Sequence, residues 1–336
     1  MEKLEKTTLS TPPGLIQSFT AGFNSVAANI RLILLPVLLD ILLWFAPRLT
    51  IKPLVQPMFQ QYFELLAASG AKDLQAFITS SQQLLQEGLD HYNLLSSLRT
   101  LPIGVPSLLS GRGVLANPLG PLKEIDLNSL GSTLGLWLII ALAGIAAGSL
   151  FFGEIARISL NLKEKFSLKR ALKNFRDTLY LTVSSYVLLA ILAIPAVILV
   201  FIISMISPTF SQLSIIFISL LLIWLLMPLI FSPHGIYGYN QNVFTSAINS
   251  IRLVRYFLPG TGVFILLGVF MSQGMDILWS FPTEDSWMVL VGILGHAFIT
   301  TGVIASSFIY YRGGLRWMNE RMQHLNSQPQ VSLDKQ

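Results

Sequence analysis

Three ionisable side chains interrupt the long apolar stretches of the sequence: Asp40, Asp276 and His296. Placing an ionisable group in hydrocarbon is costly, so residues of this kind usually mark a functional site. Two carboxylates and a histidine have the chemistry to bind a cation or to relay a proton. The alternative is a structural hydrogen bond between Asp40 and His296 that holds the first spanning helix against the sixth, with Asp276 reaching the outer interface beside Trp279. The sequence leaves both interpretations open.

A second set of candidate residues is basic. Two amphipathic stretches next to apolar runs, 166–178 and 243–258, carry these residues on their polar faces: Lys169, Arg170, Lys173, Arg176, Arg252 and Arg255. Each basic residue close to anionic lipid headgroups contributes about 1 kcal/mol of attraction. The six residues are therefore candidates for binding a phospholipid headgroup or a protein partner. The competing interpretation is a signal for membrane orientation without a specific ligand.

Several other kinds of chemistry find no support. The sequence has no cysteine, which excludes disulfides, iron–sulfur clusters and thiolate zinc sites. It contains no P-loop, no H-E-x-x-H and no G-x-S-x-G motif. The four histidines are too scattered for haem ligation within the helices. We expect no metal site, no cofactor and no catalytic residues, and therefore no enzyme.

The elements that must position the candidate residues are helices in a membrane. Of the 336 residues, 53% are hydrophobic and 12% are charged, against about 25% charged in a typical soluble domain. Residues 179–206 contain no charge, and this stretch exceeds the roughly 20 residues that a helix needs to cross a bilayer. Five weaker apolar runs surround it: 32–46, 133–152, 210–231, 261–281 and 287–311. The sequence predicts an all-α polytopic membrane protein with six transmembrane helices.

Three short stretches share one pattern: 22–27, 171–176 and 247–252. Each has a small residue, an apolar residue, Asn or Lys, a polar residue and an apolar residue in that order, with a phenylalanine in front. Each also precedes a pair of apolar runs. We interpret this order as three repeated units, each an interfacial helix followed by a transmembrane hairpin. The alternative is that any amphipathic helix before a span shows such a pattern.

A long insertion, 48–131, separates the first span from the second. Amphipathic patterns over 53–68 and 73–95 predict two helices that form a hairpin around Ser69 and Gly70. The rest of the insertion, 98–122, is rich in proline and glycine yet apolar, and we expect it to lie irregularly over the membrane face. The predicted domains are 1–47 (cytoplasmic tail, interfacial helix and first span), 48–131 (extracytoplasmic helical insertion), 132–312 (five further spans, with interfacial helices at 166–178 and 243–258) and 313–336 (cytoplasmic polar tail).

Small residues in the second span give a further packing signal. Gly144 and Gly148 have the four-residue spacing that lets two helix backbones approach closely in lipid. Chance is the alternative, because this span is rich in alanine and glycine. The spacing favours a close approach of this span to another helix.

Basic residues are distributed unequally along the chain. With both termini on one side of the membrane, that side holds 16 lysines and arginines and the other side holds six. The positive-inside rule then places both termini in the cytoplasm. Most of the basic residues flank apolar runs, so the net charge of +5 does not indicate a nucleic-acid partner. The N-terminal stretch MEKLEKTTLSTPPG lacks the pattern of a cleaved signal peptide.

The helix order and the pattern Phe-x-x-Ala-x-Asn/Lys-x-x-Arg of the interfacial stretches support a family resemblance. Over residues 15–312, without the insertion, the chain resembles a broad set of bacterial six-helix membrane proteins. The set includes the membrane domain attached to some glycerophosphodiester phosphodiesterases. The resemblance implies a multi-pass protein of the bacterial cytoplasmic membrane. It does not imply phosphodiesterase activity, because the soluble catalytic domain of that family has no counterpart in this sequence.

Two functions follow as hypotheses. The first is a non-enzymatic membrane component, an accessory or structural subunit that binds lipid, a partner protein or both, with the insertion as a docking surface. Its expected partners are membrane lipids and other membrane subunits or further copies of the chain. The second is a permease for a small solute or lipid that uses Asp40 and His296 at mid-depth. An intramembrane enzyme ranks third, because the sequence shows no nucleophile–base pair and no metal constellation.

Overall fold

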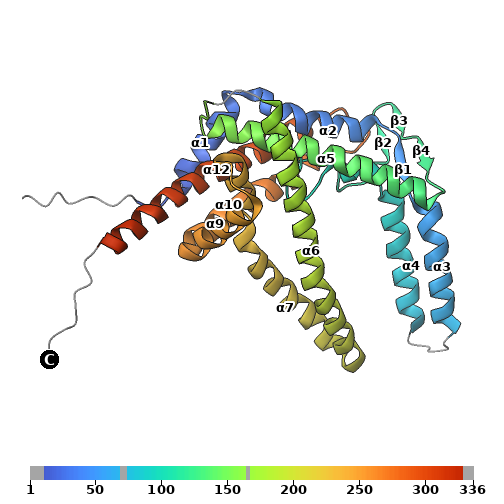
Figure 1. Cartoon of the computed structure of the whole chain (residues 1–336). Coiled ribbons are helices and arrows are strands. Elements are labelled where there is room, and N and C mark those ends of the chain that lie inside the picture. The colour runs from blue at the N-terminus through green and yellow to red at the C-terminus, as the bar shows by residue number, and fades with distance from the viewer. Residues whose placement is uncertain (1–10, 69–73, 164–166, 328–336) are drawn as a thin grey trace, which may run out of the picture. The chain divides into compact units, whose positions relative to one another are not determined.

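The structure is a computed structural model that describes residues 11–68, 74–163 and 167–327. Helices dominate this part of the chain (Figure 1). Within it, five helices are long and apolar enough to cross a membrane, and a sixth candidate is the bent pair Leu15–Ala27 and Ile30–Phe45. The five are Leu130–Ser159, Leu168–Ser204, Thr209–Tyr239, Leu258–Trp279 and Val289–His324. The prediction of a helical protein with several membrane spans is confirmed, and the three repeated units stay a prediction.

The chain folds into two compact units, and each unit is built from separate parts of the sequence. Unit 1 consists of the described residues up to Asn29, Gly153–Val269 and those from Gly302 onward. Unit 2 consists of Ile30–Phe152 and Phe270–Thr301. The domains expected from the sequence are continuous segments, so they differ from these discontinuous units.

Unit 1 is formed by helices throughout its described residues. They are α1 (Leu15–Ala27), α6 (Leu168–Ile206), α7 (Pro208–Leu226), η3 (Met227–Leu229), α8 (Ser232–Tyr239), α9 (Val243–Tyr256), α10 (Leu258–Val269), the end of α5 (Leu130–Ser159) and the part of α12 (Val289–Ser327) from Gly302 on. Helix α9 matches the interfacial helix predicted at 243–258. The other predicted interfacial helix, 166–178, is not separate, because α6 continues from Leu168 through the whole central span. At the point where the basic stretch meets the apolar stretch, the sequence has no glycine or asparagine that would end the helix.

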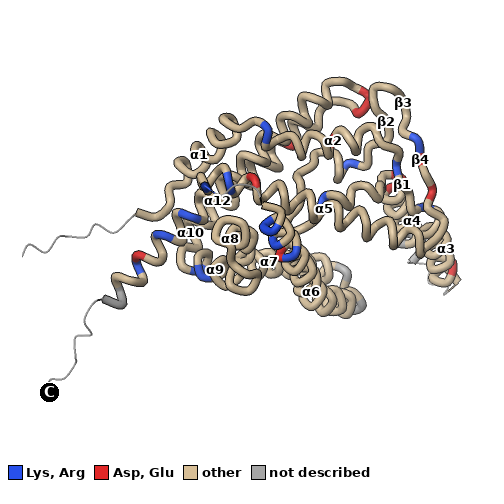
Figure 2. The backbone as a smooth tube through the Cα atoms, turned by 45° about the horizontal axis from the view of Figure 1, so that its top comes forward, with Lys and Arg blue, Asp and Glu red and all other residues tan. Residues whose placement is uncertain are grey.

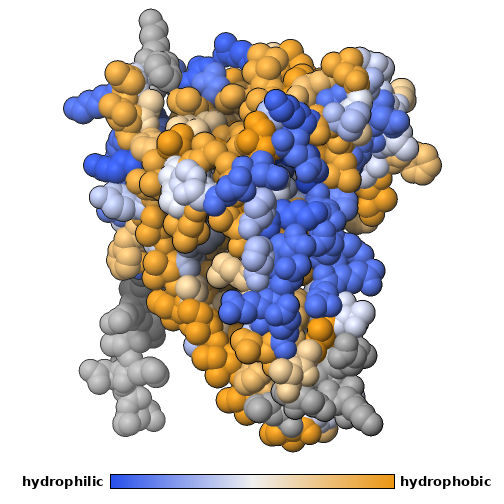
Figure 3. Space-filling view, turned by 90° about the vertical axis from the view of Figure 1, so that its right-hand side faces the viewer, coloured by the Kyte–Doolittle hydropathy of each residue, from blue (hydrophilic) through white to orange (hydrophobic). Residues whose placement is uncertain are grey.

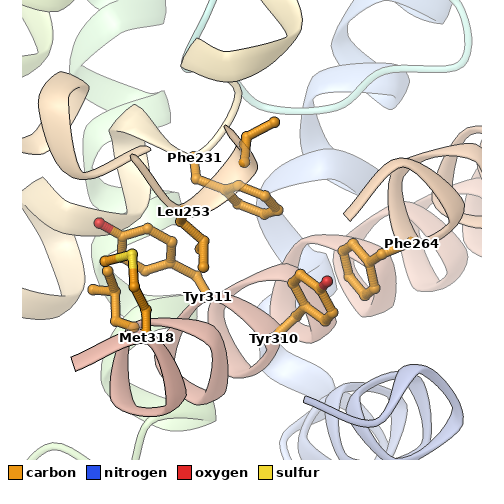
Figure 4. Close-up of a cluster of buried hydrophobic side chains, with 8 residues drawn as sticks. Phe231, Leu253, Phe264, Tyr310, Tyr311 and Met318 are labelled. Carbon is orange, nitrogen blue, oxygen red and sulfur yellow. The ribbon is translucent and has the colours of Figure 1, made fainter. Parts of the chain in front are cut away.

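The core of unit 1 is rich in aromatic side chains (Figure 4). The buried members are Phe231, Leu253, Val254, Phe264, Tyr310, Tyr311, Leu315 and Met318. Phe264 stacks on Tyr310 with ring centroids 4.2 Å apart, and on Phe19 of α1 at 4.8 Å. Gly22 lets α1 approach α12, because a Cβ atom there would lie 2.4 Å from the backbone nitrogen of Ser306. The amphipathic helix α1 is therefore held by this core.

The hairpin of α6 and α7 exposes its apolar surface. In each of the two spans, none of the residues in the most apolar window is buried. The sequence has no charged residue between Asp177 and Arg252, so both helices carry long uncharged stretches (Figure 2). A surface of this size and polarity requires lipid or another protein as its surroundings.

Unit 2 combines helices with short strands that the sequence did not predict. Its elements are η1 (Ile30–Ile33), α2 (Leu34–Phe45), β1 (Arg48–Thr50), α3 (Lys52–Ala68), α4 (Leu74–His91), η2 (Leu94–Leu98), β2 (Ala116–Asn117), β3 (Gly120–Pro121), β4 (Glu124–Asp126), most of α5, the π-helical turn η4 (Phe270–Gly274), α11 (Met275–Trp279) and the part of α12 before Gly302. Strand β1 pairs with β4 in parallel, and β2 pairs with β3 in antiparallel fashion.

Helices α3 and α4 correspond to the two helices predicted for the insertion. The predicted turn residues between them, Ser69 and Gly70, lie outside the described residues. Figure 3 faces α3 and α4, and hydrophilic residues form a broad patch on this face, while Met58, Leu65 and Leu84 of the hairpin are exposed apolar residues. The hairpin therefore has the mixed surface expected of a segment in contact with water.

The structure of residues 98–114 differs from the expectation that the irregular part of the insertion lies over the membrane face. They do not lie over an outer face, because most of their apolar side chains are buried: Ile103, Val105, Leu108, Leu109 and Val114. A Cβ atom on Gly144 of α5 would lie 2.4 Å from the carbonyl oxygen of Leu98, and one on Gly148 would lie 2.8 Å from Cα of Gly104. The two glycines thus accommodate this irregular segment instead of another helix. The segment is packed within unit 2 and offers little surface for docking.

Candidate functional site

Asp276 and His296 form a hydrogen-bonded pair in unit 2. Nδ1 of His296 lies 2.6 Å from Oδ1 of Asp276, and 3% of the histidine side chain is exposed against 24% of the aspartate side chain. A carboxylate accepts hydrogen bonds, so Nδ1 carries the proton and Nε2 of the neutral ring has a free lone pair. Asp276 therefore fixes the tautomer of His296. This pairing replaces the Asp40–His296 bond expected from the sequence, and the position of Asp276 at the outer interface beside Trp279 stays a prediction.

The local structure places Asp276 at an irregular point of its span. The π-helical turn η4 ends at Gly274, and α11 begins at Met275. A π-helical turn inserts an extra residue into a helix, changes the direction of the side chains that follow, and occurs frequently at functional sites. The turn therefore sets the direction in which Asp276 leaves the helix.

Asp40 is fully buried in α2, and its carboxylate accepts three hydrogen bonds from residues 107–109. Oδ1 accepts from the hydroxyl of Ser107 at 2.5 Å and from the amide of Leu109 at 3.0 Å. Oδ2 accepts from the amide of Leu108 at 3.0 Å. A carboxylate with three donors is well satisfied even away from water. Asp40 thus holds the irregular segment in place, a structural role with other partners than the His296 considered in the sequence analysis.

Arg112 joins the same cluster and was missed by the sequence analysis. Its amide donates to the carbonyl oxygen of Leu109 at 3.1 Å, directly beside the residues that contact Asp40. Burial lowers the pKa of Arg112, while the negative charges of Asp276, Glu284 and Asp40 act in the opposite direction. The three carboxylates thus act electrostatically on the guanidinium of Arg112. The sequence analysis did not identify Arg112 as a candidate because the glycine- and proline-rich segment around it was interpreted as an irregular segment over the membrane face.

Glu284, Trp44 and Trp279 make further contacts in this part of unit 2. Oε2 of Glu284 accepts from the amide of Leu115 at 2.8 Å, and its carbonyl oxygen accepts from Nε1 of Trp44 at 2.9 Å. The ring of Trp279 packs against α12 at Gly295, where a Cβ atom would lie 2.7 Å from the ring. Gly295 directly precedes His296, so Trp279 lies next to the histidine. We call Asp40, Arg112, Asp276, Glu284 and His296 the buried polar cluster; Asp40 and His296 are buried, and the other three are half-buried.

Three buried nitrogen atoms in this region have no hydrogen-bond partner among the residues that the structure describes. They are Nε2 of His296, Nη2 of Arg112 and Nε1 of Trp279. Unsatisfied buried polar atoms are few in folded proteins, and each requires an explanation. In the described ranges, no group of three or more His, Cys, Asp or Glu side chains is arranged to hold a metal ion. The unpaired nitrogen atoms can therefore take up a proton or donate hydrogen bonds to acceptor atoms of a ligand.

The six basic candidate residues lie in unit 1. Four lie in the first turns of α6: Lys169, Arg170, Lys173 and Arg176. Arg252 and Arg255 lie near the end of α9, and both are exposed. Asp177 is 2.9 Å from Arg176 and 3.8 Å from Lys173, so its carboxylate offsets part of the positive charge of α6. This arrangement leaves headgroup binding by the six residues as a prediction.

Comparison with known proteins gives no family. No protein-family model matches the chain, and neither a curated protein nor a solved structure matches it. The resemblance to bacterial six-helix membrane proteins therefore stays an expectation, and the functional argument depends on the buried polar cluster.

Proposed function

We propose that this chain is a non-enzymatic membrane permease that couples the movement of a small solute to the binding and release of a proton by the buried polar cluster. The observation that supports the proposal best is the Asp276–His296 pair, in which the buried Nε2 atom has no partner among the described residues. Histidine is the side chain whose charge ordinarily changes between about pH 5 and 8. A histidine oriented by a carboxylate and open at its second nitrogen is suited to accept a proton.

The irregular segment 98–114 adds support. Gly144 and Gly148 lie about 21 and 27 Å along α5 from Leu130, at about 1.5 Å per residue. Because α5 qualifies as a span, the segment packed against these glycines reaches deep into the membrane. Irregular backbone at such depth is tolerated only where protein covers it or where it lines a water-filled cavity. Transporters commonly form their substrate sites from backbone of this kind.

The proposal includes an orientation. The distribution of basic residues supports cytoplasmic termini with the α3–α4 hairpin on the outer side. The resemblance to bacterial six-helix membrane proteins supports the bacterial cytoplasmic membrane as the location. In this orientation a solute and a proton enter unit 2 from one side and leave on the other. The direction of transport follows the gradient that is applied.

A second candidate function is an accessory subunit of a membrane assembly. It is favoured by the α6–α7 hairpin, whose most apolar windows contain no buried residue. Another membrane subunit or a second copy of the chain would cover this surface, although lipid would cover it equally well. We rank this function second because it assigns no role to the buried polar cluster.

The first prediction is that His296→Gln abolishes proton-coupled transport. Glutamine retains a hydrogen-bonding amide for Asp276 but does not take up a proton in this pH range. The purified protein is reconstituted into vesicles that contain a pH dye, and a panel of small acids, amines, amino acids and sugars is added outside. We expect one solute class to move protons above the rate of protein-free vesicles with the wild type, and no such flux with His296→Gln.

The matched control is His91→Gln. His91 is exposed at the end of α4 and contacts the carbonyl oxygen of Glu87 in its own helix. This substitution removes one histidine without touching the buried polar cluster, so proton flux should be unchanged. If no solute class moves protons with the wild type, or if the flux survives His296→Gln in a folded protein, the permease proposal is wrong.

A further inference from the structure

The unfilled hydrogen-bonding capacity of the buried polar cluster is almost entirely on nitrogen. Its carboxylates already have donors: Asp40 has three, Asp276 has His296, and Glu284 has the amide of Leu115. In and beside this cluster, three buried atoms have no partner among the described residues: Nη2 of Arg112, Nε1 of Trp279 and Nε2 of His296. The first two are donors at every relevant pH, and the third becomes a donor when the histidine is protonated. A ligand that completes this set must supply acceptor oxygens.

The three nitrogen atoms belong to one small region of unit 2. The Trp279 ring contacts α12 at Gly295, next to His296. Leu108 of the irregular segment packs in one apolar cluster with Trp279, and its amide donates a hydrogen bond to Asp40. The amide of Arg112 donates a hydrogen bond to the carbonyl oxygen of Leu109, which directly follows Leu108 in the sequence. The three unfilled nitrogens thus come from side chains in one connected part of unit 2.

We propose that Arg112, Trp279 and His296 bind the oxyanion of a small solute, a carboxylate or a phosphate, together with a proton on His296. A guanidinium presents paired N–H groups that match the two oxygens of a carboxylate or phosphate. The indole N–H and the protonated imidazole each donate one further hydrogen bond. This inference rests on the permease proposal and names the substrate class for it.

Charge explains why the proton accompanies the anion. The carboxylates Asp40, Asp276 and Glu284 act electrostatically on Arg112, and the guanidinium of Arg99 lies in the same segment, bonded to Ser107 and Ser110. A deprotonated oxyanion adds another negative charge to this set, which opposes binding while His296 is neutral. Protonation of His296 offsets that charge and also turns Nε2 into a donor. Binding should therefore be stronger when His296 is protonated than when its ring is neutral.

The test is an equilibrium measurement on the full chain in detergent. Isothermal titration calorimetry is performed with acetate, inorganic phosphate and, as a cation, methylammonium. We expect one molar equivalent of acetate or phosphate to bind, no binding of methylammonium, and weaker binding as pH rises. Arg112→Gln should weaken binding about tenfold or more, as expected for the loss of a bidentate charge-assisted pair. Arg112→Lys keeps the charge without the paired geometry and should give an intermediate loss.

Arg99→Gln is the matched control. Arg99 lies in the same segment, but its Nη1 atom is already bonded to the carbonyl oxygen of Ser107 and the hydroxyl of Ser110, both at 3.3 Å. Anion binding should be unchanged by this substitution. Trp279→Phe removes only the indole N–H donor from the site and should weaken binding less than Arg112→Gln. Size-exclusion chromatography of every variant shows whether it is folded.

The outcomes separate this inference from the permease proposal. Proton flux with amines and no binding of acetate or phosphate overturns the oxyanion assignment and leaves the permease proposal standing. Binding of acetate with no proton flux supports the site and overturns the permease. Competition between acetate and added phosphatidylglycerol identifies a lipid phosphate as a source of the oxyanion, whereas no competition identifies a free solute. Equal binding by wild type and folded Arg112→Gln contradicts the inference.

Discussion

Asp40→Ala should destabilise the protein more than any other single substitution considered for unit 2. The alanine leaves the amides of Leu108 and Leu109 and the hydroxyl of Ser107 without their acceptor at a fully buried position. Each orphaned buried donor costs about 1–3 kcal/mol, so the total loss should be about 3 kcal/mol or more. Thermal unfolding in detergent, followed by tryptophan fluorescence, should show a large drop in Tm or a loss of folded yield.

Asp285→Ala is the control for this prediction. Asp285 is exposed in the turn between α11 and α12, and removal of its carboxylate should change stability by less than about 0.5 kcal/mol. Asp40→Asn keeps one acceptor oxygen and should lie between the two. If Asp40→Ala unfolds at the wild-type temperature, residues 107–109 are not held by this carboxylate.

Gly144→Ala should also destabilise the protein, although alanine favours helices. In a helix interior, Gly→Ala ordinarily gains about 0.8–1.0 kcal/mol. At Gly144, however, the new Cβ atom would lie 2.4 Å from the carbonyl oxygen of Leu98 and 2.9 Å from its carbonyl carbon. These are backbone atoms, so the irregular segment must shift, and overpacking of this kind costs about 1–3 kcal/mol. The net change should be a lower unfolding temperature.

Gly135→Ala provides the matched comparison, since it is in the same helix and nothing lies within 4 Å of its added Cβ atom. That substitution should leave stability unchanged or raise it. The two variants differ only in what the added methyl group meets, so opposite signs would confirm that α5 packs against residues 98–104. Equal stability of both variants would show that the irregular segment lies elsewhere.

The sequence was sufficient for the features that depend on local pattern. Spans such as α6 and α12 have uncharged stretches longer than a bilayer requires, and the insertion helices have clear amphipathic periods. Asp276 and His296 stood out because charged or titratable groups are rare in such stretches. For the same reason Asp40 was noticed, but its contacts were not predictable. Its partner Ser107 is 67 residues away in the sequence.

The rest of the site depends on long-range packing. Residues 98–114 show no helical or strand period, so their burial follows only from the glycines of α5 and the acceptor atoms of Asp40. Arg112 lies in this segment and was overlooked with it. Gly144 and Gly148 were correctly identified as positions of close approach, but an interhelical contact was expected because that is the usual role of such spacing. The neighbour in the structure is irregular backbone.

The most direct test of the account is the protonation of His296 itself. Nitrogen-15 NMR of histidine-labelled protein in bilayers distinguishes a protonated from a bare ring nitrogen, and comparison with His296→Gln assigns the signals. Spectra are recorded over a range of pH. We expect a neutral ring, with a proton on Nδ1 and none on Nε2, in the protein without acetate, and both nitrogens protonated in the protein with acetate bound. A His296 ring that stays neutral across this range, with or without acetate, would contradict the proposal that this residue carries the transported proton.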